Sequence, residues 1–394
     1  MAQFFGRVFD GFGRELGTGV ELNPDGQLTS ILTSGDPGDG YIIPGLIDAH
    51  EHGAGGFSYS DDPEPAHIAT AIETHLAAGT TAMLASLVSM KDPLPVIQAL
   101  VPFCESGQLA GIHLEGPFVS VEKKGAQNPA AIRDIDLDEL HSWLEAGRGW
   151  LKTMTIAPER AHAQEAANML LDFGGKPSWG HTSATAADAR SVLDATVLAA
   201  RERGRSDVPQ TVTHLFNGMF DPVHRTPGPV REFVQAARQG NASLEIIADG
   251  HHIAPELVED MWLYLEHVEG FGEAPAMFFI TDSLSAAGME PGHYVLGGLA
   301  VEVRNGACYL EGQSSLAGGY ARLSDQFALF ARRGRLSVSQ LVRACVAGPA
   351  RALALTDHTP GVTLHYRHGE KPSFLTLDAD FNVTHVVRDG VLVR

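Results

Sequence analysis

The central part of the chain alternates short apolar runs with amphipathic stretches. Thr80–Leu87, Leu109–Leu114 and Ala276–Ile280 are apolar runs of the length expected for buried strands, and Ala66–Ala78 has the spacing of a helix. A regular alternation of strands and helices predicts a parallel sheet. About eight such units over roughly 300 residues favour a closed (β/α)₈ barrel over an open doubly wound sheet.

Both ends of the chain are predicted to form short strands joined by turns. Val20–Leu22 and Leu28–Leu32 flank one turn, and Phe374–Leu377 and Val383–Val387 lie near the C-terminus. Neither end has enough apolar residues for a core of its own, so we expect them to pair. The predicted fold is therefore α/β, a TIM-like barrel with a small β-sandwich. The predicted domains are 1–43 with 352–394 for the sandwich, and 44–351 for the barrel.

Charge and cysteine content exclude several classes of protein. The 394 residues carry a formal net charge of −20, without the basic stripe that nucleic-acid binding needs. No uninterrupted apolar run approaches the roughly 18 residues of a membrane helix. The three cysteines are far apart and odd in number, which favours a reducing compartment. We expect a cytoplasmic protein with a small-molecule ligand. Because the protein as a whole is negatively charged, an anionic ligand would need a local cationic pocket.

Imidazole and carboxylate side chains follow one predicted strand after another. The carboxyl ends of barrel strands meet at one mouth, so these side chains should converge there. His50 and His52 are two residues apart and should point to one side of an extended strand. This donor set predicts a divalent metal site, with Zn²⁺ first and Fe²⁺, Mn²⁺, Co²⁺ or Ni²⁺ as alternatives. The residues at strand ends are His50, His52, His113, Glu115, His181, His214, His251, His252 and Asp282.

Six segments resemble, in order, the motifs of the N-acetylglucosamine-6-phosphate deacetylases of the amidohydrolase superfamily. The resemblance covers nearly the whole chain, and HLEGPF together with THLFNGM is its most specific part. The segments are PGLIDAHEHG (44–53), HLEGPF (113–118), GHTSA (180–184), THLFNGM (213–219), IADGHH (247–252) and ITDSLSAAG (280–288).

The resemblance implies roles for most of these strand-end residues. Glu115, His181 and His214 would hold the principal metal ion. His50 and His52 match the position of a second ion in some members, so one or two ions per subunit are expected. Asp282 would accept a proton from water and return it to the leaving amine. His113 or His252 would donate a hydrogen bond to the oxyanion.

The resemblance also implies a substrate, an amino-sugar phosphate, and a way of holding it. Arg225 would come from a neighbouring subunit, which implies a homodimer. Leu316 is expected in a late loop over the substrate. The groups implied to hold the sugar phosphate are Asn217, the backbone of Gly218, Arg225 and His252.

Gln127 departs from the family pattern, which has a histidine that contacts the sugar at this position. Glutamine donates and accepts hydrogen bonds but carries no charge. The expected reaction is deacetylation of N-acetylglucosamine 6-phosphate. Because Gln127 is a predicted substrate-binding residue that differs from the family pattern, N-acetylgalactosamine 6-phosphate is an alternative substrate. Two further alternatives are an amidohydrolase acting on cyclic or N-acyl amides and a non-catalytic oligomeric scaffold.

Overall fold

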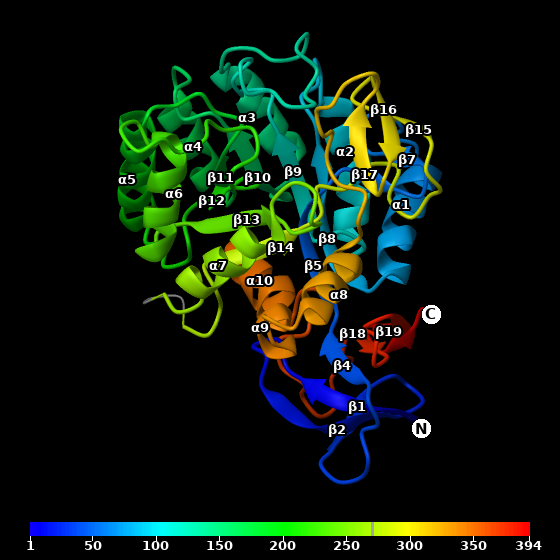
Figure 1. Ribbon diagram of the computed structural model, residues 1–394. Helices are drawn as coiled ribbons and strands as arrows, with labels where there is room; N and C mark the ends of the chain where they lie inside the picture. The colour runs from blue at the N-terminus through cyan, green and yellow to red at the C-terminus, as the bar shows by residue number, and fades with distance from the viewer. Residues whose placement is uncertain (269–271) are drawn as a thin grey trace.

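The computed structural model describes residues 1–268 and 272–394, with a barrel of eight parallel strands at its centre (Figure 1). Each barrel strand pairs with the strand that comes before or after it in the barrel series, and all eight residues of Thr80–Leu87 are buried. The predicted (β/α)₈ architecture is confirmed. The barrel strands are β5 (Leu46–Glu51), β8 (Thr80–Leu87), β9 (Gly111–Glu115), β10 (Leu151–Ile156), β11 (Lys176–Trp179), β12 (Thr211–Val212), β13 (Ser243–Ile247) and β14 (Met277–Ile280).

Helices surround the barrel, and some of them begin at a capping side chain. Asp136 accepts hydrogen bonds from two backbone N–H groups of α3, and Thr185 forms a capping box with Asp188 at the start of α5. Among the described helices, none has the length and apolar character to cross a membrane. The helices are α1 (Pro65–Ala77), α2 (Leu94–Glu105), α3 (Leu137–Ala146), α4 (Ala163–Asp172), α5 (Ala186–Glu202), α6 (Gly228–Arg238), α7 (Pro255–Leu265), α8 (Leu323–Arg333), α9 (Val338–Val342), η1 (Arg343–Ala347, a π-helix) and α10 (Gly348–Leu353).

The barrel closes between its first and last strands, just where the site lies. The backbone N–H of Asp282 donates to the carbonyl of His50 over 2.8 Å, and the N–H of His52 donates to the carbonyl of Ser283 over 2.8 Å. These two bonds continue the parallel pairing beyond the end of β14. They therefore fix Asp282 beside the two histidines that follow from β5.

The two chain ends form one seven-stranded sheet, which lies below the barrel with both termini (Figure 1). Its two edges approach each other, since a Cβ atom at Gly26 would lie 2.3 Å from the carbonyl oxygen of Gly390. The sheet encloses a small core that includes Val20 and Phe374. The domain boundaries themselves stay a prediction. The strands, in sheet order, are β20 (Val391–Leu392), β19 (Val383–Arg388), β18 (Phe374–Leu377), β4 (Tyr41–Pro44), β1 (Ala2–Phe9), β2 (Glu15–Leu22) and β3 (Leu28–Leu32).

A three-stranded antiparallel sheet after β14 was not predicted from the sequence. Its two tight turns, at Gly297-Gly298 and Asn305-Gly306, are the signal that would have revealed it. The sheet packs on Leu284 through its own small core and brings Leu296 to the mouth of the barrel. Its strands are β15 (His293–Leu296), β16 (Leu299–Arg304) and β17 (Ala307–Leu310), and a further small hairpin pairs β6 (Gly53–Ala54) with β7 (Phe57–Ser58).

Thr81, at the start of β8, joins the barrel to the chain-end sheet. Its hydroxyl donates to the carbonyl of Gly361 over 2.5 Å, and its carbonyl accepts from Nε of Arg388 over 2.9 Å. Gly361 is buried with φ +79°, and a Cβ atom there would lie 1.9 Å from the Thr81 carbonyl oxygen. A side chain at this position would push the two parts of the fold apart.

We predict that Gly361→Ala lowers the free energy of unfolding by about 2–5 kcal/mol, through left-handed strain and overpacking together. Gly369→Ala is the matched control, because Gly369 has φ +83° with nothing within 4 Å of the added Cβ atom. It should cost only about 1 kcal/mol of strain. Urea denaturation of both variants measures the difference, and equal losses would contradict the close contact at Thr81.

Candidate active site

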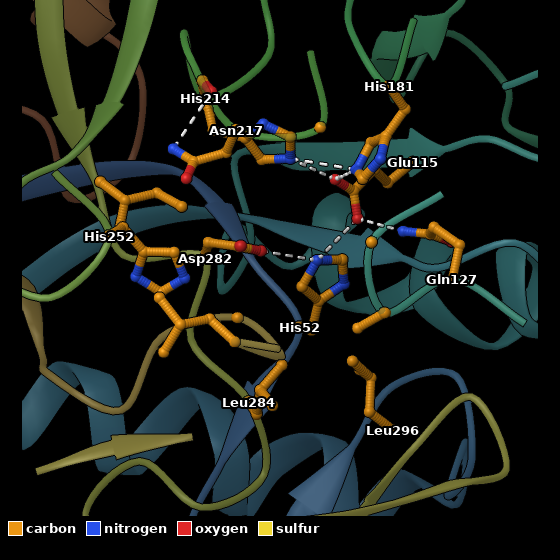
Figure 2. A pocket seen from close by; sticks show the side chains of 16 residues that line it. His52, Glu115, Gln127, His181, His214, Asn217, His252, Asp282, Leu284 and Leu296 are labelled. Atoms are coloured by element: carbon orange, nitrogen blue, oxygen red, sulfur yellow. Dashed lines mark hydrogen bonds and ion pairs between the residues drawn. The ribbon is translucent and has the colours of Figure 1, made fainter. Parts of the chain in front are cut away.

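The predicted metal ligands and Asp282 meet at the carboxyl ends of the barrel strands (Figure 2). Three of them lie two residues beyond the end of a strand and adopt positive φ: His181 (47°), His214 (23°) and Asp282 (48°). Residues other than glycine rarely occupy this region, and such strain persists where the surrounding structure enforces it. The barrel thus holds all three backbones in conformations that direct their side chains to a common centre.

Glu115 is the residue that the whole site shares. Its Oε1 atom lies 2.8 Å from Nε2 of His181 and 2.8 Å from Nε2 of His214, and those two nitrogens are 3.1 Å apart. The three side chains are buried. Their ligand atoms lie within 4.8 Å of one another, as one shared ion requires. The structure brings these three side chains together, and their role as metal ligands stays a prediction.

A second group of ligand atoms forms on the other oxygen of Glu115. Oε2 lies 3.2 Å from Nε2 of His52, and Oδ1 of Asp282 lies 3.1 Å from the same nitrogen. Nε2 of His50 is 3.1 Å from Nε2 of His52 and 3.4 Å from Asp282. Glu115 is therefore placed to bridge two cation positions, one on each carboxylate oxygen.

Burial and charge act in opposite directions on these groups. Burial alone would raise the pKa of Glu115, but the charges and hydrogen bonds of His181, His50 and His214 hold it well below its usual value. Burial would lower the pKa of His52, yet Asp282 and Glu115 raise it to about 9. The cavity thus stabilises positive charge next to its two ionised carboxylates.

The donor set fits divalent metal ions. Two pairs of imidazole nitrogens face each other at 3.1 Å, and each pair also faces a carboxylate oxygen. Without a cation, this arrangement would need protons on adjacent buried imidazoles, which repel each other. A divalent ion satisfies both nitrogen lone pairs and the carboxylate at once, and imidazole with carboxylate is a common ligand set for Zn²⁺ and similar ions.

The backbone fixes the orientation of two ligating rings. Nδ1 of His181 lies 2.8 Å from the carbonyl oxygen of Lys123, and Nδ1 of His52 lies 3.1 Å from that of Ser86. A ring nitrogen facing a carbonyl carries the proton, so Nε2 keeps its lone pair for the site. Gly218 packs directly on His181, since a Cβ atom there would lie 2.8 Å from Nδ1.

A cavity of about 140 Å³ opens beside the ligands (Figure 2). This volume suits part of a small molecule. Gln127 contributes to the wall, but both ends of its amide are already engaged: Nε2 donates to Oε2 of Glu115 over 2.5 Å, and Oε1 accepts from the N–H of Ser89 over 2.6 Å. The predicted substrate residues in the wall are Gln127, Asn217, Gly218, His252 and Leu316.

His252 enters the cavity on the side of Asp282 (Figure 2). Its Nδ1 lies 2.8 Å from Oδ2 of Asp249, which leaves Nε2 as the ring nitrogen available to a ligand. Burial opposes protonation of His252, but the hydrogen bond and charge of Asp249 outweigh it and raise the pKa of the ring. His252 is therefore a hydrogen-bond donor beside the proposed proton acceptor.

Two candidates lie outside this cavity. Arg225 is exposed and does not line the pocket of its own chain. His113 lies below the site, where its ring nitrogens are 3.0 Å from the hydroxyl of Ser86 and 2.9 Å from that of Thr155. Both of its polar atoms are occupied, so of the two expected oxyanion donors only His252 reaches the cavity.

Sequence reasoning missed two buried carboxylates that hold site histidines. Asp249 fixes His252, and Glu245 lies 3.1 Å from Nδ1 of His50. Glu245 stands inside the apolar strand Ser243–Ile247, where every residue is buried. A lone charged residue in such a strand was the signal that could have marked it.

Comparisons with known proteins agree with this geometry. The Amidohydrolase family model matches residues 41–393. The chain is 30% identical to N-acetylglucosamine-6-phosphate deacetylase of Bacillus subtilis (strain 168), covering 93% of this chain and 90% of that protein. It is 27% identical to N-acetylgalactosamine-6-phosphate deacetylase of Escherichia coli O157:H7, with 89% and 87% covered.

A solved structure resembles the whole chain. It is a mutant N-acetyl-D-glucosamine-6-phosphate deacetylase from Mycobacterium smegmatis in complex with N-acetyl-D-glucosamine-6-phosphate. The TM-score is 0.84 at 30% identity, and the match covers 99% of this chain and 98% of that chain.

We predict that removal of divalent ions with a chelator destabilises the protein. Ligand binding to the folded state adds about 4 kcal/mol at a thousandfold excess of free ion over Kd. Calorimetry should show a lower Tm after chelation and recovery on adding Zn²⁺. Glu115→Gln, which lacks the shared carboxylate, should gain far less from Zn²⁺. Identical melting of stripped and Zn²⁺-loaded wild-type protein would contradict a metal centre.

Proposed function

The chain belongs to the amidohydrolase family, and we propose that it hydrolyses the acetamide of N-acetyl-D-glucosamine 6-phosphate to D-glucosamine 6-phosphate and acetate. The observation that carries the proposal is the shared carboxylate of Glu115 between two histidine pairs, with Asp282 at the edge of the cavity. Relatives that act on phosphorylated N-acetyl amino sugars match nearly the full length of the chain. The site geometry and these relatives together support the acetamide C–N bond as the bond that is hydrolysed and phosphorylated N-acetyl amino sugars as the class of substrate.

The chain supplies both ligands and proton transfer. Glu115, His181 and His214 would hold one divalent ion, and His50, His52 and Glu115 a second. A bound ion polarises the amide carbonyl and lowers the pKa of water towards about 7. We propose Zn²⁺ as the physiological ion.

Asp282 is placed to move the proton. Burial would raise its pKa, but the hydrogen bond from His52 and the charge of His50 lower it, so the carboxylate is ionised at neutral pH. It would accept the proton of the attacking water and deliver it to the amine nitrogen as the C–N bond breaks. His252 would donate from Nε2 to the substrate on the same side of the cavity.

The phosphate group of the substrate needs a cationic partner. Arg225 does not line the cavity of its own chain, so it cannot be that partner within one subunit. We propose that the protein is a cytoplasmic homodimer in which Arg225 reaches the neighbouring site, as a guanidinium fork suits phosphate. Exposed Phe220 and Val223 lie in the same loop as Arg225 and offer apolar surface for that contact. Asn217 and the backbone of Gly218 would complete the sugar-phosphate contacts.

We predict that Asp282→Asn lowers kcat by 10³-fold or more, since an amide cannot accept the proton. The variant should still fold and bind the ion held by Glu115, His181 and His214. Acetate release and bound-metal analysis measure the two properties separately. Full activity in Asp282→Asn would overturn the role of this residue.

A mixing experiment tests Arg225 and the dimer together. Arg225→Ala and Asp282→Asn should each be nearly inactive alone. Mixed dimers would regain one complete site, giving about a quarter of wild-type activity at equal mixing. Mixtures as inactive as the separate variants, after subunit exchange is verified, would contradict a shared site.

Substrate choice is tested by acetate release from the 6-phosphates of N-acetylglucosamine and N-acetylgalactosamine and from both free sugars. We expect strong dependence on phosphate and preference for the gluco isomer. Preference for the galacto isomer would support the related activity of the Escherichia coli relative. Equal turnover of phosphorylated and free sugars would rule out the phosphate role of Arg225.

A further inference from the structure

Glu245 contacts the far side of His50. Its Oε2 atom lies 3.1 Å from Nδ1 of His50, and both side chains are almost fully buried, with 2% and 0% exposed. We propose that Glu245 is a positioning residue that creates the second cation position, the one for which His50, His52 and the bridging Glu115 supply ligands beside Asp282. The inference rests on the proposed metal-dependent function and is independent of which sugar is hydrolysed.

The four ligating imidazoles differ in what supports them. Nδ1 of His52 and Nδ1 of His181 face backbone carbonyls, while Nδ1 of His214 has no hydrogen-bond partner within the described part of the chain. His50 faces a carboxylate. A carboxylate holds the proton on Nδ1, fixes the ring, and makes Nε2 a stronger electron donor than a carbonyl does. The structure therefore strengthens one ligand of one cation position.

Charge supports the same conclusion. Two divalent ions bring four positive charges, whereas Glu115 and Asp282 bring two negative charges. Glu245 adds a third carboxylate directly behind His50. Glu245 is the one charged residue of its buried strand, and a buried carboxylate is costly unless it is paired. Its hydrogen bonds run to His50 and, over 3.3 Å, from the backbone N–H of His214. Pairing with His50 therefore offsets the cost of burying the Glu245 carboxylate.

The effect should be selective between the two positions. Glu115, His181 and His214 form the other position without using the side chain of Glu245 as a partner of either ring. Loss of the Glu245 charge should weaken the ion at His50 and His52 and leave the first ion bound. A general packing defect would lower both affinities.

The test is to count and titrate ions in Glu245→Gln and Glu245→Leu. Gln keeps the shape and an acceptor oxygen but removes the charge; Leu removes both. With Zn²⁺ as the probe and a chromophoric chelator in competition, wild-type protein should hold two ions per chain. The second ion should bind about 10-fold more weakly in Glu245→Gln and about 100-fold more weakly in Glu245→Leu, the range of such outer contacts.

Ser178→Ala is the matched control, because this buried hydroxyl lies in the same barrel interior but bonds Thr213. It should keep both ions at wild-type affinity. Excess Zn²⁺ should restore deacetylation in Glu245→Gln by refilling the second cation position. If Glu245→Leu fails to fold, Glu245→Gln decides alone.

Two ions bound at unchanged affinity in Glu245→Gln, or equal weakening of both, would overturn this inference while leaving the proposed function intact. A wild-type protein that holds one ion would also overturn it. A wild-type protein that binds no divalent ion and still hydrolyses the substrate would instead overturn the metal-dependent function itself.

Discussion

The placement of ionised carboxylates and imidazoles in one buried cluster is the constraint on which this structure depends. Glu115 and Asp282 are buried, yet both keep their pKa values below the usual range because imidazoles surround them. Buried charge without a partner is strongly destabilising. Oε1 of Glu115 contacts His181 and His214, and Oε2 contacts His52, so each carboxylate oxygen has imidazole partners that offset the cost of its burial.

Barrel closure provides the precision that such a cluster needs. His50, His52 and Asp282 come from the first strand and from just beyond the last, and backbone hydrogen bonds across that seam set their spacing. Below it, Thr281 donates to Asp48 over 2.6 Å, which ties the same two strands together inside the barrel. The ligands are thus held by the rigid sheet as well as by their own loops, which favours catalysis that depends on fixed geometry.

Substrate access depends on parts of the chain that are not barrel strands. The three-stranded sheet after β14 supplies Leu296, and the loop that follows it supplies Leu316 to the cavity wall. In many barrel enzymes such additions after the strands set specificity while the metal ligands stay on the sheet. Here the polar ends of Gln127 are engaged by Glu115 and Ser89, so this residue supports the metal site in addition to lining the cavity.

The sequence by itself determined the barrel and the gathering of imidazoles and carboxylates at its mouth, because strand periodicity is local and the strand order of a (β/α)₈ barrel brings successive strand ends to one mouth. The assignment of Glu115, His181 and His214 as one ligand trio came from the resemblance of their motifs to those of a known family. The resemblance also identified Asp282 and His252 through their motifs. Only the tertiary structure decided that His113 lies below the cavity, that Gln127 bonds Glu115, and that Glu245 and Asp249 hold site histidines. These contacts join residues on different strands or loops. Which side chain faces which depends on register and closure, and no local pattern of residues encodes that.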